Sequence, residues 1–231
     1  MTVSIRSIIR KMLQPMLSLV YKVYASIPHW HHHNGITVKV LPSVFHPAYF
    51  LSTKILLEQL LKYQIKNKSV LELGAGSGLI SLAAAKQGAI VTATDINPAA
   101  LASIKSSMAK NELGIRLILS DLFTNIPEEK FDYIVINPPY YPRSAKNYRE
   151  MAFFCGPNYE YFEKLFFQLA EYKTPNNTIM MILSEDCHID VIKSIALTGN
   201  FELHEIHAVK KMGEVNHIYE LQSQQHTNHQ Q

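Results

Sequence analysis

From residue 68 onward, short apolar runs alternate with segments that have helical character. Val70-Leu71-Glu72-Leu73 precedes a glycine turn, an alanine-rich segment follows to about Gln87, and residues 89–94 form the next apolar run. Such alternation predicts an α/β fold in which a parallel sheet is covered by helices. Further strands are expected at residues 116–119, 133–136 and 178–183, and further helices at residues 98–110, 159–172 and 190–198.

The last two apolar stretches, residues 201–209 and 215–221, flank a short Lys-Lys-Met-Gly segment and predict a C-terminal hairpin. Residues 222–231 are polar and rich in glutamine, so we expect them to form a disordered tail. Ahead of the repeating pattern, residues 36–40 alternate apolar and polar side chains. This alternation predicts a half-buried strand after the turn at Asn34-Gly35.

Residues 3–25 place apolar side chains near helical spacing, which predicts an amphipathic helix bent at Pro15. Basic residues interrupt this segment, so it has no uncharged stretch long enough to span a bilayer and no uninterrupted signal-peptide core. We therefore expect no integral membrane association. The helix either packs against the main domain or lies on a membrane surface. The predicted organisation is an N-terminal extension at 1–34, one domain at 35–221 and the tail at 222–231.

A cluster of histidines, His29, His31, His32 and His33, lies just before the Asn-Gly turn. Consecutive side chains do not readily converge on one ion in regular structure, and no nearby Cys or Glu completes a ligand set. The sequence therefore predicts no metal site.

Composition narrows the class of protein without naming a substrate. The chain has 231 residues, of which 47% are hydrophobic and 18% charged, as expected for one domain with a buried core. Its formal net charge of +3 is far below the strongly positive net charge of a dedicated nucleic-acid binder, although a local basic patch is compatible with it. Cys155 and Cys187 have neither close pairing nor metal-type spacing, which favours a reducing, cytoplasmic location.

The segment from Glu72 to Gly78 follows a predicted strand and opens a predicted helix. Its glycines allow a sharp turn and a close approach of the backbone to a ligand. A dinucleotide fingerprint needs a third glycine at position 79, which is Leu79, so a nicotinamide dehydrogenase loses its main support. Asp95 ends the next strand, where a carboxylate can accept both hydroxyl protons of a ribose. Separately, these features also fit a tight turn and a helix cap before Pro98; together they favour a nucleoside cofactor.

At these residues the sequence resembles the class I S-adenosylmethionine-dependent methyltransferases, over roughly residues 36–221. The resemblance implies a Rossmann-like, mostly parallel sheet of seven strands with helices on both faces and a C-terminal antiparallel hairpin. It places Glu72 beside the methionine end of the cofactor, Asp95 at the ribose and Asp121 at the adenine amino group. The cofactor site implied in this way comprises Glu72, Gly74, Ala75, Gly76, Gly78, Asp95, Ile96, Asp121, Leu122 and Asn137.

Asn137-Pro138-Pro139-Tyr140 follows an apolar strand, at the edge where open α/β sheets bind ligands. The two prolines restrict the backbone and hold its carbonyl groups in place, although a Pro-Pro turn can also be merely structural. An amide or aromatic amino nitrogen is a poor nucleophile because its lone pair is delocalised. If the Asn137 side-chain oxygen and the Pro138 carbonyl accept its protons, the nitrogen is aimed at a methyl donor, and Tyr140 can stack on the planar acceptor. We therefore assign catalytic roles to Asn137, Pro138 and Tyr140.

The tetrad resembles the motif of methyltransferases that act on glutamine side chains or on exocyclic adenine nitrogens. Residues 35–53, which include Val44-Phe45-His46-Pro47 and Thr53, and residues 153–159 resemble the release-factor glutamine methyltransferase group. The chain departs from that group where His46-Pro47 replaces Pro-Arg and Cys155-Gly156 replaces Gly-Gly, and in its reduced N-terminal helical region. The substrate-binding residues we expect are Pro139, Tyr141, His46 and Phe50.

The sequence does not distinguish between several possible methyl acceptors. Methylation of a glutamine in a translation factor or ribosomal protein leads over adenine N6 methylation of ribosomal or transfer RNA, and a small amine is a third option. Arg143, Lys146 and Arg149 either contact RNA phosphates or the carbonyls of a protein loop, or form a solvated loop. An inactive subunit that binds the cofactor for a partner is the alternative of another class.

Overall fold

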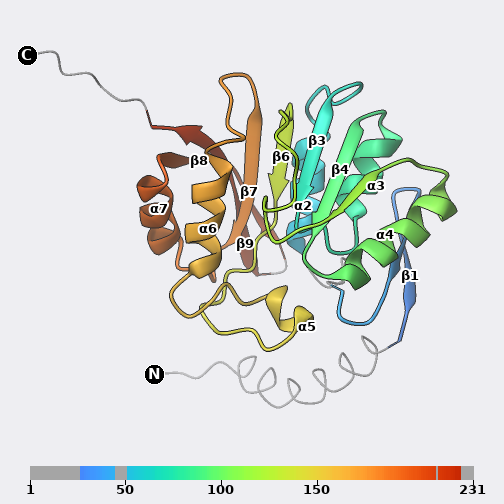
Figure 1. Cartoon of the computed structure of the whole chain (residues 1–231), viewed down its shortest axis with the longest axis horizontal. Helices are drawn as coiled ribbons and strands as arrows, with labels where there is room; N and C mark the ends of the chain where they lie inside the picture. The colour runs from blue at the N-terminus through green and yellow to red at the C-terminus, as the bar shows by residue number, and fades with distance from the viewer. Residues whose placement is uncertain (1–26, 45–50, 212, 225–231) are drawn as a thin grey trace, which may run out of the picture.

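The computed structural model describes residues 27–44, 51–211 and 213–224 (Figure 1). Its centre is a seven-stranded sheet in the order β5-β4-β3-β6-β7-β9-β8. The strands from β5 to β7 pair in parallel, whereas β9 is antiparallel to both β7 and β8, which confirms the predicted fold class. The sheet strands are β3 (Ser69–Leu73), β4 (Ile90–Asp95), β5 (Arg116–Leu119), β6 (Tyr133–Ile136), β7 (Thr178–Ser184), β8 (Phe201–Lys211) and β9 (Glu214–Ser223).

Helices cover both faces of this sheet because its strands alternate apolar side chains between two cores. In β6, Val135 packs into one cluster of buried residues while Ile134 and Ile136 pack into the other. The first cluster includes residues of α2 (Leu51–Leu60), α3 (Leu79–Lys86) and α4 (Pro98–Asn111); the second includes residues of α6 (Glu160–Leu169) and α7 (Ile189–Thr198). No described helix is both long and apolar enough to cross a membrane.

A separate hairpin precedes the sheet, formed by β1 (His29–His33) and β2 (Ile36–Val40). The sequence predicted β2 but not β1, and the boundary drawn after residue 34 runs through the turn between the two strands. In β1, alternation turns His29, His31 and His33 to one face, and the rings of His31 and His33 stack with centroids 6.5 Å apart. The predicted helix at 3–25 lies outside the described residues. At the other end, β9 continues to Ser223, beyond the predicted start of the tail.

The free edge of β2 is paired by side chains of α4 rather than by another strand. Asn111 accepts from Thr37 N–H at 2.9 Å and donates to its carbonyl at 2.6 Å. Ser107 Oγ accepts from Lys39 N–H at 2.8 Å. Ser103 continues the same stripe and bonds to the carbonyl of Lys39 and the N–H of Leu41. This docking places the chain that follows β2 beside the carboxyl edge of the sheet, at Val44.

Candidate active site at the carboxyl edge of the sheet

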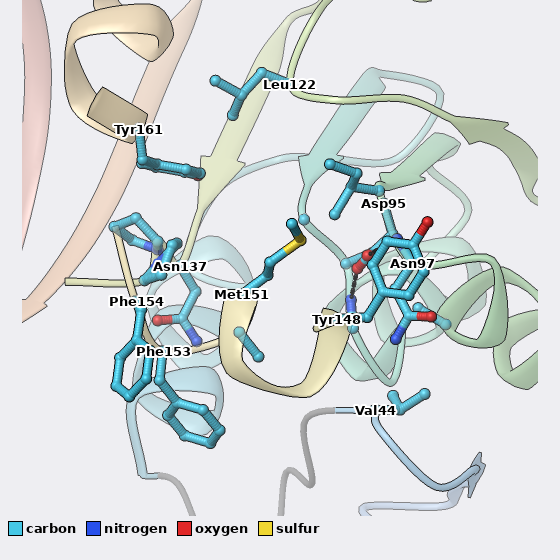
Figure 2. A pocket seen from close by; sticks show the side chains of 18 of the residues that line it. Val44, Asp95, Asn97, Leu122, Asn137, Tyr148, Met151, Phe153, Phe154 and Tyr161 are labelled. Carbon is cyan, nitrogen blue, oxygen red and sulfur yellow. Dashed lines mark hydrogen bonds between the residues drawn. The ribbon is translucent and has the colours of Figure 1, made fainter. Parts of the chain in front are cut away.

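A cavity of about 380 Å³ opens at the carboxyl ends of β3, β4 and β6 (Figure 2). It lies where the strand order reverses, between β3 and β6, the position at which open α/β sheets bind ligands. Figure 2 shows Asp95 and Asn97 on one side of the cavity and Asn137, Phe153 and Phe154 on the other. The predicted site residues that line it are Glu72, Gly74, Ala75, Gly76, Asp95, Ile96, Asp121, Leu122, Asn137, Pro138, Pro139, Tyr140 and Tyr141. His46 and Phe50 lie outside the described residues.

The glycine loop turns between β3 and α3 with Gly74, Gly76 and Gly78 all at positive φ. A Cβ added to Gly74 would meet no atom within 4 Å, so the backbone there borders open space of the kind a ligand can fill. Gly78 is different, because it does not line the cavity. A Cβ at Gly78 would lie 2.5 Å from Ile104 Cγ1, so this glycine allows α3 to pack against α4.

Asp95 ends β4 with both carboxylate oxygens held by backbone donors. Oδ2 accepts from Gly76 N–H and Oδ1 from Asn97 N–H, each at 2.8 Å. Asn97, not Asp95, caps α4 by accepting from Ala99 N–H at 3.0 Å. Each oxygen can accept a further hydrogen bond, so the side chain can accept from two hydroxyl groups of a ribose. Burial raises the pKa of Asp95.

Glu72 is buried at the end of β3, where its side chain accepts from Ser81 N–H at 2.8 Å and from the Ser81 hydroxyl. Burial, and to a lesser extent the charge of Asp95, raise the pKa of Glu72 to about 7. A carboxyl group in this state ionises readily when a cation approaches. It therefore suits the positively charged end of a cofactor.

Asp121 lies in the loop after β5, and its carboxylate forms an ion pair with Lys164 of α6. Both side chains line the cavity. The neighbouring Leu122 has a φ of 53°, which turns the chain sharply beside the site. The contact with Lys164 was not predicted from the sequence, because the two residues are 43 positions apart in the chain. The role of Asp121 toward an adenine stays a prediction.

Asn137 follows β6 and is held by the first turn of α2. Its Nδ2 group donates to Ser52 Oγ and to Thr53 Oγ1, both at 3.3 Å. No described residue donates a hydrogen bond to the side-chain oxygen of Asn137, which belongs to a half-buried side chain on the cavity wall. The oxygen is thus available as an acceptor for a ligand N–H group.

An aromatic wall surrounds the tetrad on its other side. The rings of Tyr140 and Tyr141 lie 4.8 Å apart, and the N–H groups of both residues donate to the Phe153 carbonyl, at 3.2 and 3.0 Å. Tyr141 also forms a β-bridge with Phe154. Burial raises the pKa of Tyr140 well above its ordinary value, so its side chain in the cavity wall is a neutral hydroxyl.

Two features of the segment that follows the tetrad were not predicted from the sequence. The four-residue helix α5 (Tyr148–Met151) brings Tyr148 and Met151 to the cavity, and Figure 2 shows Met151 between the Asp95 and Asn137 sides. The Arg143 guanidinium lies 5.9 Å from the ring centroid of Phe154.

The two cysteines take no nucleophilic part in this arrangement. Cys155 and Cys187 are free and buried. Burial raises the pKa of Cys155 to about 11 and that of Cys187 to about 12, so both are neutral thiols at physiological pH. Among the described residues there is also no cluster of side chains able to hold a metal ion.

The doubly covered sheet, the glycine loop, the carboxylate of Asp95 at the end of β4 and the Asn137 tetrad together define the class of S-adenosylmethionine-dependent methyltransferases. Residues 35–155 match the family model of the methyltransferase small domain, and the chain belongs to this family.

Comparisons with known proteins agree with this class. The chain is 37% identical over 156 residues to a candidate protein N5-glutamine methyltransferase of Methanocaldococcus jannaschii. The match covers 65% of this chain and 77% of the relative. It is 37% identical over 120 residues to ribosomal RNA small subunit methyltransferase C of Haemophilus influenzae, covering 51% of this chain but only 36% of that protein. In structure it resembles the T. thermophilus 16S rRNA N2 G1207 methyltransferase in complex with AdoMet and guanosine, with a TM-score of 0.63 and 21% identity. That match covers 84% of this chain and 50% of the other.

Proposed function

We propose that this chain transfers a methyl group from S-adenosylmethionine to the side-chain amide nitrogen of a glutamine in a protein. The observation that carries the proposal is the orientation of Asn137, whose nitrogen is engaged by two hydroxyl groups and whose oxygen is left to the cavity. The M. jannaschii relative is named for N5-glutamine methylation, and the matched region covers 77% of that protein. This similarity supports the same acceptor. A translation factor or a ribosomal protein is the substrate class we expect.

The cavity offers complementary groups for each part of the cofactor. Asp95 would hold the ribose hydroxyls and Glu72 would lie beside the methionine end, while Gly74 leaves its space open. Asp121 and Leu122 would border the adenine. When bound, S-adenosylmethionine supplies an electrophilic methyl group on a positively charged sulfur.

At the acceptor end, the chain orients a weak nucleophile instead of activating it with a strong base. The Asn137 oxygen and the Pro138 carbonyl would accept the two N–H protons of the acceptor, while Tyr140 would stack on its plane. The acceptor nitrogen, held in this way, would bond to the methyl carbon while the carbon–sulfur bond breaks, and the electron pair of that broken bond would stay on sulfur. One N–H proton leaves to water afterwards, so the products are an N-methyl amide, the neutral thioether and a proton.

Methylation of an exocyclic adenine nitrogen in RNA is the second candidate. The same pair of acceptors on Asn137 and Pro138 suits an aromatic amine, and the H. influenzae relative is named for ribosomal RNA. Arg143, packed on Phe154 beside the tetrad, would contact a phosphate in this case.

The deciding experiment supplies labelled S-adenosylmethionine to the full chain in a ribosome-containing cell extract and then separates protein from RNA. Label in protein that maps to a methylated glutamine, and that is absent with Asn137→Ala, supports the proposal. Label in RNA would replace it with the adenine reaction. Label in neither fraction would refute both polymer substrates and favour a small amine or an inactive partner subunit.

A further inference from the structure

The first turn of α2 contributes two hydroxyl groups to the acceptor end of the cavity. Ser52 and Thr53 both line the cavity, and each lies 3.3 Å from Asn137 Nδ2. Neither residue belongs to the glycine loop or to the Asn137 tetrad. Thr53 is buried with an exposed fraction of 6%, so this contact is largely shielded from water.

An asparagine side chain can present either of two chemically opposite ends to a ligand. Its oxygen accepts hydrogen bonds, whereas its NH₂ group donates two. Only the oxygen can accept a hydrogen bond from the N–H group of an incoming amide or amine. The NH₂ group would place its own donors against the N–H donors of the substrate. The orientation of the Asn137 side chain therefore determines whether the site can hold its acceptor.

We propose that Ser52 and Thr53 are positioning residues that set this orientation by accepting the two N–H groups of Asn137. This inference rests on the proposed function, because the orientation matters for an acceptor that brings N–H donors. Without the two hydroxyls, the NH₂ group would have no acceptor on the α2 side. It would then gain by turning toward the water in the cavity, which places donors where the acceptor nitrogen must approach.

Helix α2 is a rigid support for such a contact. Its buried residues include Ile55, Leu56, Leu57 and Leu60, all of which belong to the core on that face of the sheet. Thr53 lies one turn before Leu56 and Leu57, on the same side of the helix. The packing of these side chains fixes the height and rotation of the first turn relative to β6, and so fixes the hydroxyls relative to Asn137.

The test compares Ser52→Ala/Thr53→Val with Thr53→Ser and with the control Thr198→Val. Thr198 lies at the end of α7, on the other face of the sheet, where its exposed hydroxyl donates to the Ile195 carbonyl. With saturating S-adenosylmethionine and a ribosome-containing extract as acceptor, we expect the double variant to methylate about 30-fold more slowly. Thr53→Ser and Thr198→Val should keep rates within about threefold of wild type, and the affinity for S-adenosylhomocysteine should not change in any variant.

A wild-type rate in the double variant would overturn the inference, and so would a rate in Thr53→Ser as low as in the double variant. A second readout needs no turnover. In the full chain labelled with ¹⁵N-asparagine, the side-chain NH₂ signal of Asn137 is identified by its loss in Asn137→Ala. Its exchange with water should be about tenfold faster in the double variant. Unchanged exchange in the double variant would refute the positioning role. If the wild-type chain methylates no polymer but its Asn137 NH₂ group still exchanges more slowly than in the double variant, only the proposed function is refuted.

Discussion

Three polar side chains at the carboxyl ends of neighbouring strands are each held by a different kind of partner. Glu72 is bound by Ser81 of α3, Asp95 by the N–H groups of Gly76 and Asn97, and Asn137 by hydroxyl groups of α2. All three residues line the cavity, and each keeps at least one oxygen that can accept a further hydrogen bond. At the scale of single residues, the site is a set of oriented acceptors.

Asn137→Ala removes the acceptor that we expect to hold the substrate nitrogen. Methyl transfer should fall by at least about 100-fold, since the nitrogen loses both its orientation and its hydrogen-bond partner. The affinity for S-adenosylhomocysteine should change by less than about threefold, because Asp95 and the glycine loop are untouched. Turnover assays and calorimetric titration measure the two effects. Retained turnover would remove Asn137 from the catalytic machinery.

Glu72 makes folding stability depend on pH, because burial raises its pKa to about 7 from an ordinary value of 4.5. The folded chain binds the Glu72 proton more tightly than the unfolded chain. The stabilising contribution of this proton to the free energy of unfolding is therefore complete below pH 4.5. It is lost as pH rises through about 7, which lowers the free energy of unfolding by about 3 kcal/mol. Urea unfolding should show a flatter pH dependence in Glu72→Gln between about pH 5 and pH 8.

The matched control for this measurement is Asp132→Asn. The pKa of Asp132 is lowered, chiefly by the hydrogen bond from Ser69 N–H, so this carboxyl is already ionised throughout that pH window. Its removal should leave the slope of the wild type. An unchanged slope in Glu72→Gln would show that Glu72 does not carry the buried proton.

At the scale of elements, the helices on one face of the sheet position the site through contacts with each other and with β2. Helix α4 holds β2 through a stripe of Ser103, Ser107 and Asn111, and it packs on α3 where Gly78 meets Ile104. The start of α3 carries the glycine loop, so the crossing of α3 and α4 sets the position of the loop relative to Asp95.

Gly78→Ala tests that crossing. The residue has a φ of 74° and an added Cβ would lie 2.5 Å from Ile104, so we expect a loss of roughly 2 to 4 kcal/mol in the free energy of unfolding. Gly114→Ala is the control, because a Cβ there meets nothing within 4 Å. That change should have little effect or stabilise slightly. Equal stability of the two variants in chemical unfolding would contradict the packing role of Gly78.

At the scale of the molecule, the cavity joins the two halves of the protein. Its lining comes from the loops after β3 and β4, from the tetrad after β6 and from α5 and α6, and these segments pack against the cores on opposite faces of one sheet. We therefore expect a ligand in this position to bind the folded sheet and not the unfolded chain. Ligand binding should therefore stabilise the molecule as one unit.

S-adenosylhomocysteine at about 100 times its dissociation constant should raise the free energy of unfolding by about 2.7 kcal/mol. A nicotinamide dinucleotide at the same concentration should have no such effect, since the loop lacks the third glycine of a dinucleotide site. In Asp95→Asn the stabilisation at that same ligand concentration should be smaller. Thermal or urea unfolding with each ligand makes the comparison. Stabilisation by the dinucleotide alone would contradict the assignment of the cavity.

Much of the fold was predictable because it is encoded in short stretches of the chain. The strands at 116–119 and 133–136 and the start of α4 at Pro98 match the structure, since apolar runs and helix starts are read from adjacent residues. The glycine loop and the Asn137 tetrad were also visible, because each is a contiguous motif after a strand. By contrast, β1, α2 and α5 were not predicted. The histidine-rich sequence of β1 has no apolar alternation, and α5 has only four residues. In α2, by contrast, Leu56, Leu57 and Leu60 follow helical spacing, a signal that the sequence analysis did not use.

The sequence by itself determined the order of the seven sheet strands along the chain, the class of the protein and many of the groups that line the cavity. The tertiary structure alone decided how those groups are oriented. Asn137 is held by residues 84 and 85 positions away, and Thr37 of β2 by a residue 74 positions away. Asp121 pairs with Lys164 over a separation of 43. Local patterns report what a segment buries, whereas a hydrogen bond between distant segments forms only once the packed sheet brings them together.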